Sequence, residues 1–337
     1  MKDERSRVLS GLSVGISSWM ENLTRLKPLS SPWRTMFVEK GSELECAGAS
    51  LEWRTVVVEW LLIFVLVLTF CTGFLDLGTR RPLPGNEAEV FQSLDWVLVN
   101  SISRYGQFPL WNPYLRTGLP FVADPMLHVY NPLVTVPVLL FGVLDGFKIA
   151  LFLSFLAAGL GMWWLGAVLG MGRAVRLWVA LMYAFSGPAV ARFFQGQYLF
   201  VLGFAWIPWS LAGLIAATRT RRKLHAVIAI FALALLFFSG NVYYAYYMLF
   251  VIGLYCLVML VRFRSRAPFA DWNRAGVLLV VGVLAIGIIA VQLLPLVEFW
   301  PHISKGTNPA FTDSQTIRQI LLDYISRDKN RPDALQT

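Results

Sequence analysis

Long apolar runs separated by short basic loops are the feature that most constrains how this chain can fold. The runs lie at residues 56–75, 149–170, 175–191, 198–217, 224–240, 242–261 and 275–295. Each is about as long as the 17 to 25 residues that an α-helix needs to cross a bilayer. Because 57% of the residues are hydrophobic and 15% are charged, a water-soluble core would not hide this much apolar surface. The sequence predicts an all-α polytopic membrane protein with about seven transmembrane helices.

An eighth apolar run, residues 133–144, decides the topology. It is shorter than a span, and Pro132 and Pro137 interrupt it, so a re-entrant or interfacial segment is expected. If this run does not cross, the basic short loops lie on the same side of the membrane as the N-terminus. The positive-inside rule makes that side cytoplasmic. Their basic residues are Arg173, Arg176, Arg219, Arg221, Arg222, Lys223, Arg262, Arg264, Arg266 and Arg274. The net charge of +9 is thereby explained by membrane orientation, and nucleic acid is not an expected partner.

Three regions follow from this topology. They are a cytoplasmic N-terminal region at 1–55, a transmembrane domain at 56–295 and a short outer C-terminal tail at 296–337. Apolar residues at helical spacing within 8–26 predict an amphipathic helix, with a disordered tail as the alternative. The first span is expected to remain as an uncleaved signal anchor. The large first outer loop, 76–148, contains the re-entrant segment.

Two carboxylates follow the first span closely. Glu87 and Glu89 come directly after Pro84-Gly85-Asn86, where a carboxylate at the membrane surface can serve as a general base. The alternative is that both acids favour a helix N-terminus through its dipole. Asn86 is expected to cap that helix, which should run from Glu87 to about Tyr105. Its apolar stripe would consist of Phe91, Leu94, Val97, Leu98 and Ile102.

The rest of the first loop is rich in aromatic residues, prolines and amides. Its candidate substrate-binding residues are Trp111, Asn112, Tyr114, Asp124, His128 and Tyr130. Aromatic and amide side chains suit sugar recognition, but aromatic residues also mark any bilayer interface, and composition alone favours the interface. His128 beside Tyr130 is typical of a hydrogen-bonded structural histidine rather than a metal ligand.

Several of these motifs resemble a known family. The first-loop runs are Leu83 to Glu87, Gly106 to Tyr114, Gly118 to Phe121 and Tyr130 to Leu133; the later landmarks are Ser186-Gly187, Gly196-Gln197, Ala205 to Pro208, Ser239 to Asn241 and Gln292 to Pro295 with Glu298. In this order they resemble the bacterial YfhO-type membrane proteins, which belong to the GT-C class of glycosyltransferases. The resemblance covers roughly residues 56 to 300.

The resemblance implies a GT-C-like bundle whose large first outer loop carries interfacial helices. It implies a site between that loop and the outer ends of later spans, and a polyprenyl-phosphate sugar donor. By this resemblance, the catalytic base of the GT-C class corresponds to Glu87, a position where the usual residue is Asp. Gln197 stands where relatives often have His or Asp, so it can hydrogen-bond a substrate but cannot exchange a proton. Relatives usually run longer, which implies that the tail is shortened here.

The remaining candidates lie on the predicted outer face. Arg116 and Arg192 are the cations suited to a lipid-linked phosphate, although either can equally anchor the interface. Asn241 and Glu298 are further candidate substrate-binding residues. Asp124, Glu87 and Glu89 offer oxygen ligands for a divalent cation, but their spacing does not support a site, so no metal is predicted.

Together these features predict a glycosyltransferase in the bacterial plasma membrane, with its active face outside. Its partners would be membrane lipids, the polyprenyl-phosphate sugar and a glycan, lipid or protein acceptor. The alternative is a non-catalytic scaffold, or a transport protein that binds lipid headgroups without cleaving them.

Overall fold

The computed structural model describes residues 53–302, except 80, 82, 86, 116–117, 221 and 264–267. The predicted N-terminal amphipathic helix at 8–26 lies outside these residues, as does most of the C-terminal tail. The arrangement given below is that of the compact unit that begins at Leu62.

The described chain is mostly helical. Its elements are α4 (Trp53–Cys71), α5 (Ala88–Tyr105), β1 (Trp111–Asn112), β2 (Leu119–Pro120), η1 (Phe121–Ala123), α6 (Pro132–Phe141), α7 (Val143–Val168), α8 (Arg173–Ala184), α9 (Gly187–Phe194), α10 (Tyr198–Phe204), α11 (Ile207–Thr220), α12 (Lys223–Phe237), α13 (Val242–Phe263), α14 (Pro268–Phe299) and η2 (Trp300–His302). β1 and β2 pair antiparallel, with Trp111 opposite Pro120. The expected predominantly helical fold is therefore confirmed, with this short β-pair as an addition.

Five segments of the described chain are long and apolar enough to cross a membrane. They are Arg54–Cys71, Val143–Val168, Arg173–Phe194, Tyr198–Thr220 and Ala275–Phe299. Each coincides with a predicted span, and two of them combine consecutive helices, α8 with α9 and α10 with α11. The two other predicted spans fall on α12 and α13, whose described apolar stretches are shorter. Seven spans therefore stay a prediction.

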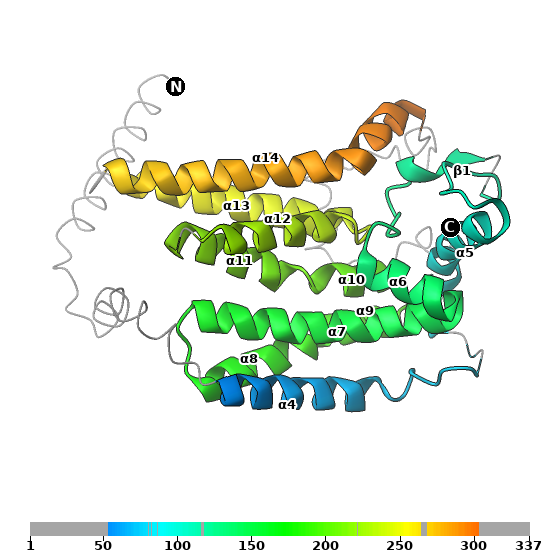
Figure 1. The fold of residues 1–337 in the computed structure, drawn as a ribbon, viewed down its shortest axis with the longest axis horizontal. Helices are drawn as coiled ribbons and strands as arrows, with labels where there is room; N and C mark the ends of the chain where they lie inside the picture. Colours follow the sequence, from blue (N-terminus) through cyan, green and yellow to red (C-terminus); the bar gives the residue numbers. More distant parts are fainter. Residues whose placement is uncertain are drawn as a thin grey trace, which may run out of the picture. The chain divides into compact units, whose positions relative to one another are not determined.

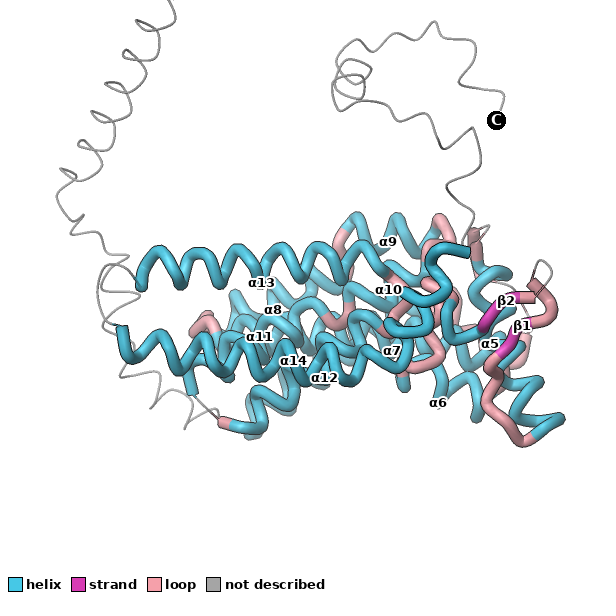
Figure 2. Tube along the Cα trace, turned by 90° about the horizontal axis from the view of Figure 1, so that it is seen from above, coloured by secondary structure: helices cyan, strands magenta, loops and turns pink. Residues whose placement is uncertain are grey.

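α7 and the α10–α11 pair form the interior of the bundle. α7 packs against α8, α10 and α11, α11 packs against α12, and α12 packs against α14. Figures 1 and 2 show α7 and α11–α14 running side by side. Few apolar side chains in the described part of α14 are buried, as expected where a helix faces lipid instead of protein.

α6 corresponds to the predicted re-entrant segment, and it is shorter than a membrane-crossing helix; that it is re-entrant stays a prediction. Ten residues of α-helix rise about 15 Å, roughly half of a hydrocarbon core. Asn131 caps the helix by accepting a hydrogen bond from the Leu133 amide, and Pro132 occupies the first turn. α6 then turns back along α7, where a Cβ on Gly146 would lie 2.4 Å from the Val138 Cα.

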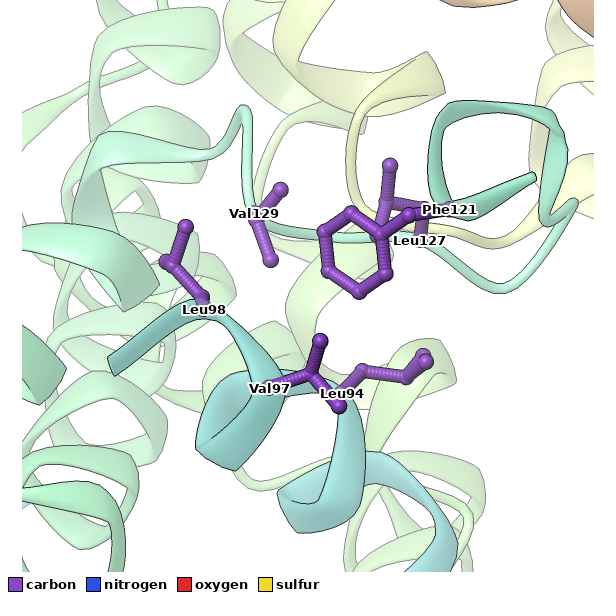
Figure 3. Close-up of a cluster of buried hydrophobic side chains, with 6 residues drawn as sticks. All are labelled: Leu94, Val97, Leu98, Phe121, Leu127 and Val129. Carbon is purple, nitrogen blue, oxygen red and sulfur yellow. The ribbon is translucent and has the colours of Figure 1, made fainter. Parts of the chain in front are cut away.

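α5 is the helix predicted in the first loop, with one correction at its start. It begins at Ala88, and Glu87 occupies its N-cap position without a side-chain hydrogen bond. The expected apolar stripe is confirmed, since Phe91, Leu94, Val97 and Leu98 are buried, but Ile102 is exposed. Figure 3 shows this stripe facing the segment after β2. The buried cluster consists of Leu94, Val97, Leu98, Phe121, Leu127 and Val129.

Glycines allow the closest helix contacts within the bundle. A Cβ on Gly213 of α11 would lie 2.9 Å from the Ala229 Cα of α12, and one on Gly161 of α7 would lie 2.5 Å from the Trp209 ring. The Trp209 indole donates a hydrogen bond to the Ala157 carbonyl at 2.8 Å. Small residues permit such contacts between membrane helices, where dispersion and hydrogen bonding drive association.

Gly213→Ala should therefore weaken the contact between α11 and α12. The added methyl group has to displace the backbone of Ala229, which we expect to cost about 1 to 3 kcal/mol and to lower the unfolding temperature in detergent. Gly253→Ala is the matched control, because a Cβ at Gly253 of α13 meets nothing within 4 Å. Equal effects of the two substitutions on the unfolding temperature would contradict this explanation.

Candidate functional site

The first loop returns to the bundle at the start of α7. The Lys148 ammonium lies 2.7 Å from Oδ1 of Asp76, which follows α4, and the Gly78 amide donates to Oδ2 of Asp145 at 3.0 Å. Hydrogen bonds from Lys148 and then from Thr79 hold the pKa of Asp76 below its usual range. The end of α4 and the start of α7 therefore lie on one face of the bundle. We call it the loop face; in Figure 1 it is the end that carries α5 and β1.

The first turn of the loop, Pro84-Gly85, packs directly on the turn between α9 and α10. Gly85 has a φ of +94°, and a Cβ there would lie 2.3 Å from the Gly196 amide nitrogen. The Tyr198 hydroxyl donates a hydrogen bond to the Pro84 carbonyl. Two backbones approach this closely only where side chains are absent. Glu87 follows two residues later and is exposed, as is Glu89 in the first turn of α5.

Arg192 lies in the last turn of α9, on the other side of that contact. Its guanidinium donates to Oε1 of Gln197, and its central carbon lies 4.4 Å from the centroid of the Phe200 ring. The same ring stacks on Tyr243 at 5.9 Å and meets Tyr244 edge-on at 5.4 Å. Among the described residues, no carboxylate comes within ion-pair distance of Arg192. A partly buried cation among aromatic rings is thus available to an anion.

A second contact joins the loop to the turn between α12 and α13. A Cβ on Gly240, whose φ is +70°, would lie 2.6 Å from the Met126 carbonyl oxygen. Asn241 is buried and caps α13, because its Oδ1 accepts a hydrogen bond from the Tyr244 amide at 3.2 Å. Its Oδ1 thus positions Tyr244, and its candidate role in binding stays a prediction.

Gln292 of α14 makes a third contact with the same part of the loop. Its Nε2 donates to the carbonyl oxygens of Asp124 at 3.2 Å and Leu127 at 3.3 Å. Gln292 belongs to a landmark motif but was not among the candidate site residues. An amide in a predicted span, where an apolar residue is expected, was the sequence signal for a buried polar partner.

The aromatic candidates divide into exposed and enclosed residues. Trp111 and Tyr114 are exposed; the Trp111 indole covers Gly118, and Tyr114 meets the exposed Trp96 edge-on at 5.1 Å. Asn112 is buried and accepts a hydrogen bond from the Tyr114 amide, so it shapes the turn. Tyr130 packs between Phe108 and Phe238 at 5.8 Å and 5.2 Å, and burial raises its pKa.

His128 is fully buried, which favours the structural role over contact with a substrate. Its Nδ1 lies 3.1 Å from the Met126 carbonyl, and its Nε2 lies 3.2 Å from Oδ1 of Asp95, which is also fully buried. Asp95 was missed by sequence reasoning. Its signal was an acidic residue within the apolar stripe of a helix, a position that requires a buried partner.

The remaining candidates do not gather into a metal site. Within the described residues, no group of three or more His, Cys, Asp or Glu side chains lies close enough to hold an ion. Oδ1 of Asp124 accepts a hydrogen bond from the Met126 amide at 2.8 Å. Glu298 is exposed near the end of α14, and Arg116 lies outside the described residues.

Gly85→Ala should detach the first loop from the α9–α10 turn. The methyl group would overlap the Gly196 backbone, so we expect a loss of about 1 to 3 kcal/mol in stability and faster proteolysis of the loop. Gly78→Ala separates the two causes, because Gly78 also has a positive φ, +79°, but open space around its Cβ position. If both variants are cleaved equally fast, backbone strain and not the contact with Gly196 explains the effect.

Comparisons with known proteins do not identify a family for this chain. No family model matches the chain, and the searches of curated proteins and of solved structures found no significant match. The resemblance to the YfhO-type proteins thus stays a prediction, and the function is argued from the site.

Proposed function

We propose that this chain is a GT-C-like membrane glycosyltransferase that transfers a sugar from a polyprenyl-phosphate donor to an acceptor at the loop face. The observation that carries the proposal is the contact of Gly85 with Gly196. It brings the loop that bears Glu87 and Glu89 to the turn that bears Arg192 and Gln197. A base for the acceptor and a cation for the phosphate are thus presented at one end of the bundle.

The proposed reaction is a displacement at the anomeric carbon of the donor sugar. The Glu87 carboxylate takes the proton from an acceptor hydroxyl as its oxygen bonds to the anomeric carbon. The bond from that carbon to the phosphate oxygen breaks, and polyprenyl phosphate leaves with the electron pair. Arg192 stabilises the negative charge that develops on the phosphate. Its contact with Phe200 and its hydrogen bond to Gln197 hold the guanidinium in place.

The exposed rings of the first loop would guide the acceptor. Trp96, Trp111 and Tyr114 expose aromatic faces at the loop face, and Trp111 is held by its packing over Gly118. Such faces suit the apolar side of a sugar ring. Asn112 and Asn241 act indirectly in this scheme, by shaping the turn of Tyr114 and capping α13.

The proposed orientation of the protein in the membrane rests on basic residues at the helix ends opposite the loop face. Arg173 begins α8, Arg219 lies in the last turn of α11, and Lys223 begins α12, all away from the loop face. Arg219 also donates a hydrogen bond to the Val168 carbonyl at the end of α7 at 2.9 Å. The positive-inside rule makes this the cytoplasmic face, so the loop face would lie outside a bacterial plasma membrane.

A second function is supported by one observation. The Arg192 cluster offers a cation to a lipid phosphate without requiring any catalytic step, and Glu87 is exposed to water. A protein that binds lipid headgroups without cleaving them would use the same cluster. The two functions differ in whether the donor is consumed.

The test is sugar transfer by the full chain in proteoliposomes, using radiolabelled polyprenyl-phosphate sugars and cell membranes as a source of acceptors. Glu87→Gln should lower the rate by about 10² to 10⁴, because the amide cannot accept the proton. Glu89→Gln is the matched control, since this residue lies two positions away and is also exposed; it should retain activity. Arg192→Gln should lower transfer and donor binding together.

Unchanged unfolding temperatures would show that each variant is folded. If the wild type consumes none of the donors but retains labelled polyprenyl phosphate in an Arg192-dependent manner, the headgroup-binding function replaces the enzyme. Equal losses in Glu87→Gln and Glu89→Gln would remove the specific role of Glu87.

A further inference from the structure

The buried pair Asp95–His128 joins α5 to the segment that docks on the bundle. This segment, residues 124–131, runs from η1 to α6 and is called the clasp segment below. Both side chains of the pair have no exposed surface, and Nε2 of His128 lies 3.2 Å from Oδ1 of Asp95. The rings of Phe91 and Phe147 meet the imidazole edge-on at 6.4 Å and 5.9 Å. The apolar cluster in Figure 3 includes two residues of the clasp segment, Leu127 and Val129.

The geometry of the imidazole determines how many protons the pair holds. Nδ1 faces the Met126 carbonyl oxygen, which can only accept, so Nδ1 carries a hydrogen atom. Nε2 faces a carboxylate oxygen. If no second proton lay between them, a nitrogen lone pair would face a buried negative charge, which is costly where water is excluded. The contact of 3.2 Å is an ion-pair contact, so the pair retains a second proton, which either makes His128 a cation beside the Asp95 carboxylate or neutralises that carboxylate.

The charged groups around the ring favour that proton. Burial lowers the pKa of His128, but the carboxylates of Asp95 and, more weakly, Asp124 oppose it, and the pKa lies above its usual value of 6.5. Phe91 of α5 and Phe147 of α7 carry no charge, and Gln292 of α14 contributes a neutral amide to the same segment. The nearby ammonium of Lys148 is paired with Asp76.

We propose that Asp95 and His128 form a pH-dependent clasp that holds the clasp segment on α5 when protonated and releases it at alkaline pH. This inference does not depend on the proposed enzyme activity. The clasp segment carries the contacts of Met126 with Gly240 and of Asp124 and Leu127 with Gln292. It also carries Tyr130, which packs on Phe238. Release would thus loosen the first loop from the α12–α13 turn and from α14 together.

The sign of the pH dependence follows from proton binding. The docked state binds this second proton more tightly than the released state does, in which His128 has its usual pKa of 6.5. The clasp is therefore fully effective below that value and is lost as the pH rises through the raised pKa of the docked state. The lost protection should amount to about tenfold for each unit by which docking raises the pKa.

Hydrogen–deuterium exchange of the full chain in lipid nanodiscs tests this between pH 6 and 9.5. After correction for the intrinsic exchange rates, amides of the clasp segment should lose protection as the pH rises, while those of α7 keep theirs. Asp95→Asn should preserve docking, because the carboxamide donates to a neutral Nε2, and should abolish the loss at alkaline pH. This variant distinguishes an effect of proton loss from an effect of misfolding.

Two further variants complete the test. His128→Gln carries no titratable group and should also show protection that does not depend on pH. Asp124→Asn removes only the weaker of the two carboxylates, so the midpoint should move to lower pH while the transition remains. A clasp segment of the wild type that is equally protected at pH 6 and 9.5 would overturn the proposal, as would an unchanged transition in Asp95→Asn.

Discussion

The close approach of backbones at glycines holds the first loop on the helical bundle. At Gly85 the loop meets the backbone of Gly196, and at Gly240 the α12–α13 turn meets the carbonyl of Met126. Both glycines have a positive φ, so a side chain would be strained there even before it collided. Because glycine has no side chain, these backbones can come into contact. The loop and the carboxylates that follow Gly85 can therefore lie on the same face as the turn.

Two buried ionic contacts hold the loop face together in surroundings with little water. Lys148 is almost fully buried and reaches Asp76, and His128 and Asp95 share a fully buried contact. Each pair joins segments that are far apart in the chain. Leaving one partner alone in such surroundings is expensive, so these pairs specify which parts of the loop meet the bundle. Arg192 differs because its described contacts are an amide and aromatic rings, which leaves its charge available to a ligand.

Several features of the fold could be predicted from residue patterns. Apolar length predicted the long apolar helices, the prolines and short length of residues 133–144 predicted a segment shorter than a span, and 3.6-residue periodicity predicted the buried stripe of α5. The start of α5 was wrong by one residue. Asn86 was expected to cap this helix, whereas Glu87 takes the N-cap position without a side-chain hydrogen bond. Helix ends are set by a few local hydrogen bonds and are therefore less predictable than helix centres.

The sequence by itself determined the class of protein, because hydrophobic length and the charge of short loops act locally and need no knowledge of contacts. It also identified the glycine, aromatic and carboxylate motifs of the first loop. Only the tertiary structure decided their roles: His128 is enclosed with Asp95, Asn112 and Asn241 hold turns, and Arg192 stands among aromatic rings. The physical reason is that burial and pairing depend on segments up to 168 residues apart, as between Gln292 and Asp124. Such contacts leave no periodic pattern along the chain.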